Sequence, residues 1–129
     1  MSGYDPSTED KLRDVLARHP RYAREAYEFI SEALAYTSQA LDKQGHVSGQ
    51  ELCEGARQLA LERFGYLART VLESWGVRET DDFGRLVYIM IEADLLRKAD
   101  TDSIDDFHDL YDFRQGFDES FRIELEPRA

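Results

Sequence analysis

The sequence of 129 residues contains one cysteine and three prolines, and it has no long hydrophobic run. With Cys53 as the only cysteine, no disulfide can form within the chain, and no paired-cysteine metal or redox motif exists. The longest uninterrupted apolar run is Leu86–Ile91, far below the roughly 18 residues that a membrane-spanning helix needs. We therefore expect a cytoplasmic protein without a membrane segment, in which Cys53 is a small buried apolar residue rather than a nucleophile.

Basic residues are also scarce, since 16 Lys and Arg stand against 27 Asp and Glu and give a net charge of −11. The excess is concentrated in residues 99–129, which contain 3 basic and 10 acidic residues, a net charge of −7. An acidic domain gains none of the counterion-release free energy that drives non-specific binding to nucleic acid. This charge disfavours nucleic acid and anionic membranes as partners.

Core-forming residues are present in the amount expected of a folded domain, with 42% hydrophobic and 12% aromatic residues. Their spacing predicts a mainly α fold with a small β-hairpin and a long amphipathic second helix. We expect a single domain, 1–129, made of a flexible leader (1–7), a helical core (8–96), an acidic hairpin (97–109), an aromatic C-terminal clamp (110–125) and a frayed end (126–129).

The ends of the first three helices carry local signals. A helix that begins near Thr8 is predicted to stop before Pro20, because the residue before a proline avoids the helical conformation. A long amphipathic helix follows, from about residue 21 to 43, with tyrosines near its edges. Ser48 and Glu51 form a capping-box pattern that starts the third helix, and Gly65 is predicted to end it.

The spacing of apolar residues in 67–96 predicts two further helices with a helix-turn-helix arrangement. Gly76 is predicted to end the first, and Thr80 to cap the second. Trp75 is expected to pack in the core against Phe83. Residues 95–99 and 104–108 are then expected to pair as a hairpin across a turn at 100–103, which gives the element order of a winged helix. Aromatic residues after Leu110, among them Phe121, are expected to hold the tail onto the domain.

The acid-rich segment from Asp100 to Asp112 invites comparison with a calcium-binding loop. The comparison fails, because Ile104 and Tyr111 occupy positions where oxygen ligands are required, and Asp105 replaces the glycine. The sequence also contains no catalytic or nucleotide-binding signature. We expect no metal, no cofactor and no catalytic residue, and the chain is predicted not to be an enzyme.

The second helix of the helix-turn-helix is apolar on more than one side. Its core-facing stripe is expected to contain Phe83 and Leu86, whereas Tyr88 and Ile89 point away from the centre of that stripe. These two side chains are therefore either buried by another part of the domain or meet another molecule. Together with Arg85, they form the predicted partner interface.

Several short blocks of the sequence are similar to one family. They are Pro20-Arg21-Tyr22, Ala26-Tyr27-Glu28-Phe29, the segment His46 to Leu52, Phe64-Gly65, Trp75-Gly76-Val77, the segment Thr80 to Gly84, and Tyr111-Asp112-Phe113. The chain resembles in these blocks a family of small uncharacterised bacterial proteins named after a locus in Methylacidiphilum infernorum. The resemblance runs from about Pro20 to Phe121 and implies bacterial origin and a cytoplasmic location, but no activity.

These observations favour a non-catalytic protein-interaction or adaptor module that binds a protein partner or forms a homo-oligomer. One alternative is a nucleic-acid-binding transcriptional regulator of winged-helix type, with contacts from Arg78, Arg85, Arg97 and Lys98. A second alternative is a metal-binding protein that uses the acidic hairpin. The acidic surroundings of those four basic residues rank the interaction module first.

Overall fold

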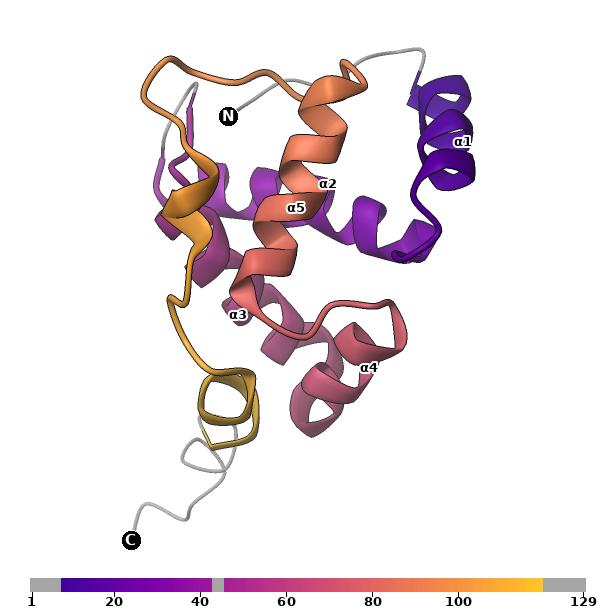
Figure 1. Ribbon diagram of the computed structural model, residues 1–129. Helices are drawn as coiled ribbons and strands as arrows, with labels where there is room; N and C mark the ends of the chain where they lie inside the picture. The colour runs from indigo at the N-terminus through magenta and orange to yellow at the C-terminus, as the bar shows by residue number, and fades with distance from the viewer. Residues whose placement is uncertain (1–7, 43–45, 120–129) are drawn as a thin grey trace, which may run out of the picture.

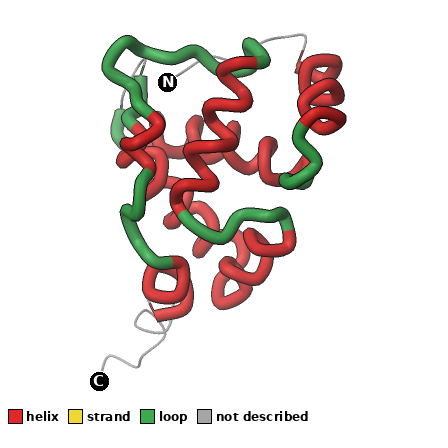
Figure 2. The backbone as a smooth tube through the Cα atoms, viewed as in Figure 1, coloured by secondary structure: helices red, strands yellow, loops and turns green. Residues whose placement is uncertain are grey.

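The computed structural model describes residues 8–42 and 46–119, which form helices joined by turns and loops, with no β-strand among them (Figures 1 and 2). The elements are α1 (Thr8–Arg18), α2 (Arg24–Ala40), α3 (Gly49–Phe64), the 3-10 helix η1 (Gly65–Leu67), α4 (Ala68–Ser74), α5 (Thr80–Glu92), the 3-10 helix η2 (Ile104–Phe107) and the π-helical turn η3 (Arg114–Glu119). The predicted mainly α fold is confirmed. The predicted leader, Phe121 and the predicted frayed end lie outside the described residues.

The predicted ends of the first and third helices are confirmed, whereas α2 is shorter than the predicted range of about 21 to 43. Helix α1 ends two residues before Pro20. At the start of α3, the Glu51 backbone N–H donates to Ser48 Oγ at 3.1 Å, and the Ser48 N–H donates to Glu51 Oε1 at 2.9 Å, which completes the capping box. Gly65 (φ 55°) ends α3, and Gly76 (φ 93°) turns the chain after α4. Both glycines have a positive φ, which residues with a Cβ rarely adopt.

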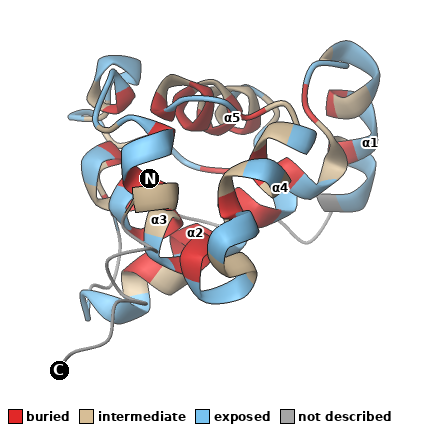
Figure 3. Ribbon diagram, turned by 90° about the horizontal axis from the view of Figure 1, so that it is seen from below, coloured by how far each residue is buried: buried red, intermediate tan, exposed pale blue. Residues whose placement is uncertain are grey.

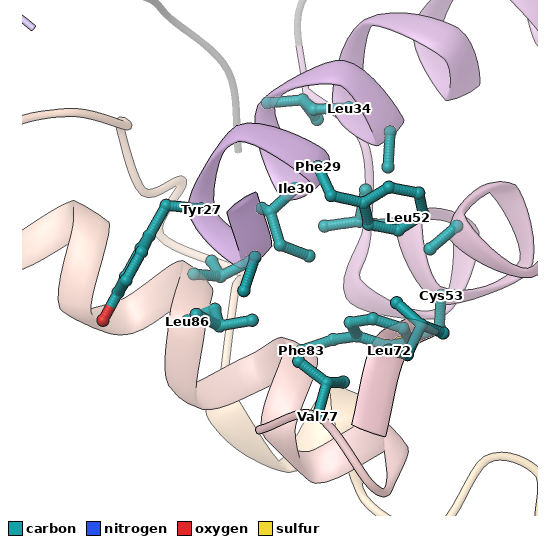
Figure 4. Packing of buried hydrophobic residues seen from close by; sticks show 14 of the residues in the cluster. Tyr27, Phe29, Ile30, Leu34, Leu52, Cys53, Leu72, Val77, Phe83 and Leu86 are labelled. Carbon is teal, nitrogen blue, oxygen red and sulfur yellow. The ribbon is translucent and has the colours of Figure 1, made fainter. Parts of the chain in front are cut away.

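The core lies between α2, α3 and α5, with α5 crossing over α2 (Figure 1). Ile30, Leu52 and Leu86 are fully buried there, as is Leu72 from α4 (Figure 4). Figure 3 shows that the buried residues of the helices face one another and that α1 lies at the edge of the domain. No helix among the described residues is both long enough and apolar enough to cross a membrane.

The predicted strand at 104–108 is wrong, because residues 104–107 form η2. Ser103 caps this turn: the Asp105 N–H donates to Ser103 Oγ at 3.2 Å, and the Ser103 N–H donates to Asp106 Oδ2 at 3.1 Å. Phe107 is buried, and its ring lies directly against Gly84 of α5. Residues 104–107 are therefore a capped turn with one buried aromatic ring rather than a strand.

Thr80 is not the cap of α5, since Glu79 occupies that position. The Thr80 side chain is buried instead, where its hydroxyl donates to the carbonyl oxygen of Phe107 at 2.7 Å and accepts from the Leu110 N–H at 3.1 Å. These two hydrogen bonds attach the segment after α5 to the start of that helix. A buried backbone carbonyl and a backbone N–H are satisfied by one side chain.

The aromatic contacts also differ from those predicted. Trp75 is half-buried and packs against Phe29 and Phe64, with ring centroids 5.9 and 5.8 Å apart, rather than against Phe83. Phe83 is fully buried, and its ring centroid lies 5.7 Å from that of Phe113. Phe113 packs in turn on Phe117 at 4.9 Å, so that the segment after residue 110 closes over α5. Trp75 and Phe83 therefore belong to separate aromatic groups of the core.

Candidate functional site

A cleft of about 510 Å³ opens beside α5, between the end of α1, the turn before α2 and the start of η2. We call it the basic cleft, and its lining residues are Arg18, His19, Pro20, Arg21, Tyr22, Arg85, Tyr88, Ile89, Glu92 and Ile104. Three arginines and one glutamate line this cleft, although the whole chain carries a charge of −11.

The turn from His19 to Ala23 forms one wall of the basic cleft. Proline at position 20 prevents α1 from continuing. The Ala23 N–H donates to the carbonyl oxygen of Trp75 at 3.1 Å, which ties this turn to the one between α4 and α5. A Cβ on Gly76 would lie 2.5 Å from the Arg21 carbonyl oxygen, so only glycine allows the two turns to approach this closely.

A buried carboxylate, Asp82, holds the basic cleft together. Its side chain has 0% exposure. Asp82 Oδ1 accepts hydrogen bonds from the Tyr22 hydroxyl at 2.5 Å, from Arg85 at 2.7 Å and from Arg21 at 3.0 Å. Asp82 Oδ2 accepts from the Arg78 backbone N–H at 2.8 Å. The carboxylate therefore joins the turn before α2 to the first turn of α5.

The electrostatics of this cluster indicate an anchor rather than a reactive acid. Burial alone would raise the pKa of the Asp82 carboxyl, but the hydrogen bonds from Tyr22, from the Arg78 backbone and from Arg85 lower it below its usual value. Burial and the hydrogen bond to Asp82 raise the pKa of Tyr22. Both carboxylate oxygens are already engaged, so this group is suited to hold two arginines and a tyrosine in place.

Tyr88, Ile89 and Ile104 form an apolar part of the basic cleft. Tyr88 and Ile89 are half-buried, and Ile104 is 45% exposed. The Tyr88 hydroxyl is buried and has no hydrogen-bond partner among the described residues. Burial, followed by the negative charges of Asp102 and Asp106, raises the pKa of Tyr88, so the phenol keeps its proton at neutral pH.

The structure places all three predicted interface residues, Arg85, Tyr88 and Ile89, in the lining of the basic cleft. It does not bring the predicted nucleic-acid contacts together. Arg78 precedes α5, and Arg97 and Lys98 follow it, so the 13-residue helix separates them by about 20 Å. All three side chains are exposed, and none of them lines the cleft.

The acidic segment between Asp100 and Asp112 uses its carboxylates locally. Asp102 accepts from the Ala99 N–H, Asp106 belongs to the cap of η2, and Asp112 accepts from the Arg114 and Gln115 N–H groups. Among residues 8–42 and 46–119, no three His, Cys, Asp or Glu side chains are grouped as a metal site would require. Cys53 is fully buried, as predicted.

The sequence did not indicate Arg18, Arg21, Tyr22 or Ile104 as part of this site, because they lie on other segments of the chain. Nor did the sequence indicate that Asp82, in the first turn of α5, is buried. One available signal was its spacing, since Asp82 stands four residues before Leu86 on the same face of α5. A charged residue that begins the apolar face of a helix is buried only when an oppositely charged group or hydrogen-bond donors pair with it.

Comparison with protein-family models, with curated proteins and with solved structures gave no match to this chain.

Proposed function

We propose that the protein is a non-catalytic interaction module, and that its basic cleft receives an acidic, partly apolar segment of a partner protein. The observation that supports this most strongly is the composition of the cleft. Tyr88, Ile89 and Ile104 offer an apolar surface, and arginines fixed by Asp82 stand beside it. Aromatic and arginine side chains are the residue types enriched at protein interfaces.

Charge complementarity determines the kind of partner. Asp82 neutralises part of the charge of Arg21 and Arg85, but their side chains remain 54% and 42% exposed. Each guanidinium therefore keeps donors that can reach a carboxylate of the partner. An apolar side chain flanked by Asp or Glu matches both parts of the cleft, and we propose such a segment as the ligand.

A nucleic-acid-binding role is the second candidate. Helices α4 and α5 follow one another across a short turn, as in a helix-turn-helix, and this order is what favours a winged-helix regulator. Against it, residues 104–107 form a 3-10 helix where a wing strand would be required, and Arg78 lies far from Arg97 and Lys98. A metal-binding role for the acidic segment has no grouped ligands to support it among the described residues.

The location that fits the proposal is the bacterial cytoplasm. A single, fully buried cysteine suits a reducing compartment. The resemblance to a bacterial family points the same way.

The test compares two substitutions at equally exposed positions. Ile104 and Leu41 are both 45% exposed, but only Ile104 lines the basic cleft. Ile104→Asp and Leu41→Asp proteins are immobilised and exposed to lysate, and the proteins they retain are identified by mass spectrometry. We expect partners retained by the wild type to be lost from Ile104→Asp and kept by Leu41→Asp.

Purified candidates from that experiment are then titrated against the Arg85→Glu protein. We expect binding to weaken at least about tenfold, because a carboxylate on the partner would meet a carboxylate. Equal retention by both Asp variants, or an unchanged affinity of Arg85→Glu, would contradict the proposal. Light scattering on the same samples shows whether the partner is a second copy of the chain.

A further inference from the structure

A second cleft of about 510 Å³ lies between α1, α2 and the C-terminal end of α5. We call it the acidic cleft, and its lining residues are Glu9, Leu12, Tyr27, Glu28, Ser31, Glu32, Ala35, Met90 and Leu95. Its volume lies within the range of about 300–1,000 Å³ that is usual for small-molecule sites. Its three charged lining residues are all carboxylates, which separates it from the basic cleft.

The Tyr27 hydroxyl is the feature of the acidic cleft that packing does not explain. Tyr27 is 1% exposed, and its hydroxyl has no hydrogen-bond partner among the described residues. In Figure 4 the ring leaves α2 on the side opposite Phe29, and the hydroxyl points away from the other labelled side chains. Burial raises the pKa of Tyr27 to about 12, so the phenol stays neutral at physiological pH. A buried hydroxyl without a partner is unfavourable, and a ligand that meets it would remove that cost.

The carboxylates of the acidic cleft are held only by surface ion pairs. Glu9 pairs with Arg24, and Glu32 pairs with Arg63, but neither arginine lines the cleft. Glu28 is the least engaged, since Arg24 Nε lies 3.9 Å from it and its side chain is 53% exposed. Exposed pairs of this kind contribute little, so a cation bound in the cleft can compete for the carboxylates.

We propose that the acidic cleft binds a small organic cation that consists of a primary ammonium group, an apolar body and a second polar group. The ammonium would lie between Glu28 and Glu32, which are one helical turn apart on α2 and face the same side. The apolar body would contact Leu12, Met90 and Leu95. The second polar group would meet the Tyr27 hydroxyl. This site is separate from the basic cleft and does not depend on its proposed role.

Three related compounds test the assignment. Tyramine has the ammonium, an aromatic body and a hydroxyl; phenethylamine lacks the hydroxyl; and 4-hydroxyphenylacetate replaces the ammonium by a carboxylate. We expect tyramine to bind saturably with a Kd below about 1 mM in calorimetry. Phenethylamine should bind about 3- to 10-fold more weakly, as one hydrogen bond is lost. The anion should not bind detectably.

Variants locate the site. Tyr27→Phe should weaken tyramine about 3- to 10-fold while leaving the melting temperature of the free protein equal or higher, because an unpaired buried hydroxyl is removed. Glu28→Gln should weaken both amines. Tyr88→Phe removes the other buried hydroxyl that has no partner among the described residues. Tyr88 belongs to the basic cleft, so this change should leave tyramine affinity unchanged.

Several results would overturn the proposal. They are a lack of saturable binding by either amine below about 1 mM, equal binding of the anion, and an unchanged tyramine affinity of the Tyr27→Phe protein. Chemical-shift changes at Tyr88 and Ile89 rather than at Leu12 and Met90 would place the amine in the basic cleft and would also contradict it. None of these results bears on the Ile104→Asp and Leu41→Asp comparison.

Discussion

The Tyr22 hydroxyl donates to Oδ1 of Asp82 across 2.5 Å, although the two residues are 60 positions apart in the chain. This bond ties the segment before α2 to the first turn of α5, and with Arg21 and Arg85 it completes the hydrogen bonding of one oxygen. A fully buried carboxylate is tolerated only when it is paired and hydrogen-bonded in this way. The basic cleft therefore has a rigid side, and its guanidinium groups are held in position before any partner arrives.

Asp82→Ala is expected to lower the free energy of unfolding by about 3 kcal/mol, near the lower end of the range for breaking a buried ion pair. The lower end applies because Arg21 and Arg85 are partly exposed and can turn to water. Urea denaturation measures the change. The control is Asp81→Ala, whose carboxylate pairs with the exposed His108 and should cost less than about 1 kcal/mol. Equal losses in both variants would show that the carboxylate at position 82 is not the anchor.

Tyr22→Phe is expected to make the protein more sensitive to acid. Because the folded-state pKa of Asp82 is lowered, its stabilising contribution is present above the usual carboxyl pKa of about 3.9 and is lost as the pH falls below that value. Removal of the Tyr22 hydroxyl raises the folded-state pKa, so the contribution is lost at a higher pH. Circular dichroism during acid titration should show a higher midpoint than in the wild type. An unchanged midpoint would contradict this role of the hydroxyl.

Trp75 and Phe64 are expected to be coupled by about 0.5–1.5 kcal/mol, the range for aromatic pairs in edge-to-face contact. Their rings are 5.8 Å apart at an interplanar angle of 83°. A double-mutant cycle of Trp75→Leu and Phe64→Leu, followed by urea denaturation, measures this coupling. The same cycle between Trp75 and Phe83 serves as the control and should give less than about 0.5 kcal/mol. A larger coupling to Phe83 would support the packing first predicted from the sequence.

Gly76→Ala is expected to destabilise the protein by about 2–4 kcal/mol, through backbone strain at positive φ and a steric clash. The new Cβ would approach the Arg21 carbonyl oxygen to 2.5 Å. The turn before α2 would have to move, and the arginine next to Asp82 would move with it. Thermal denaturation measures the cost. An alanine variant as stable as the wild type would show that the two turns do not need to lie so close.

The protein is expected not to bind duplex DNA more tightly than the usual non-specific range of about 10⁻⁴–10⁻⁶ M at physiological salt. The basis is the net charge of −7 in residues 99–129 and the separation of Arg78 from Arg97 and Lys98 along α5. Fluorescence anisotropy with random duplexes at several salt concentrations measures it. Salt-sensitive binding below about 10⁻⁶ M would favour the regulator over the interaction module.

The helices were predictable because their signals are local. The capping box at Ser48 and Glu51, the proline after α1 and the glycines after α3 and α4 act within a few residues of the chain. The hairpin prediction failed because a capped turn at Ser103 and the burial of Phe107 against Gly84 outweighed a short alternating pattern.

The site was only partly predictable. The apolar residues on two sides of α5 indicated Tyr88 and Ile89, because helical periodicity can be recognised within a single helix. The burial of Asp82 depends on Arg21 and Tyr22, whose position beside α5 is a result of the tertiary fold. Ile104 also lines the cleft only because the tertiary fold brings it beside α5. Neighbours that are brought together from distant segments leave no periodic signal in a single sequence.

The two hydrogen bonds of Thr80 have a consequence for which residues can occupy that position. Its hydroxyl donates to the carbonyl oxygen of Phe107 and accepts from the Leu110 N–H. One side chain thus pairs two backbone groups that lie three residues apart in the loop. Valine has the same shape but offers neither a donor nor an acceptor, so it would leave two backbone groups unpaired. Serine would keep both hydrogen bonds. Evolutionary drift at position 80 should therefore be confined to hydroxyl-bearing residues for as long as the chain after α5 follows its present path.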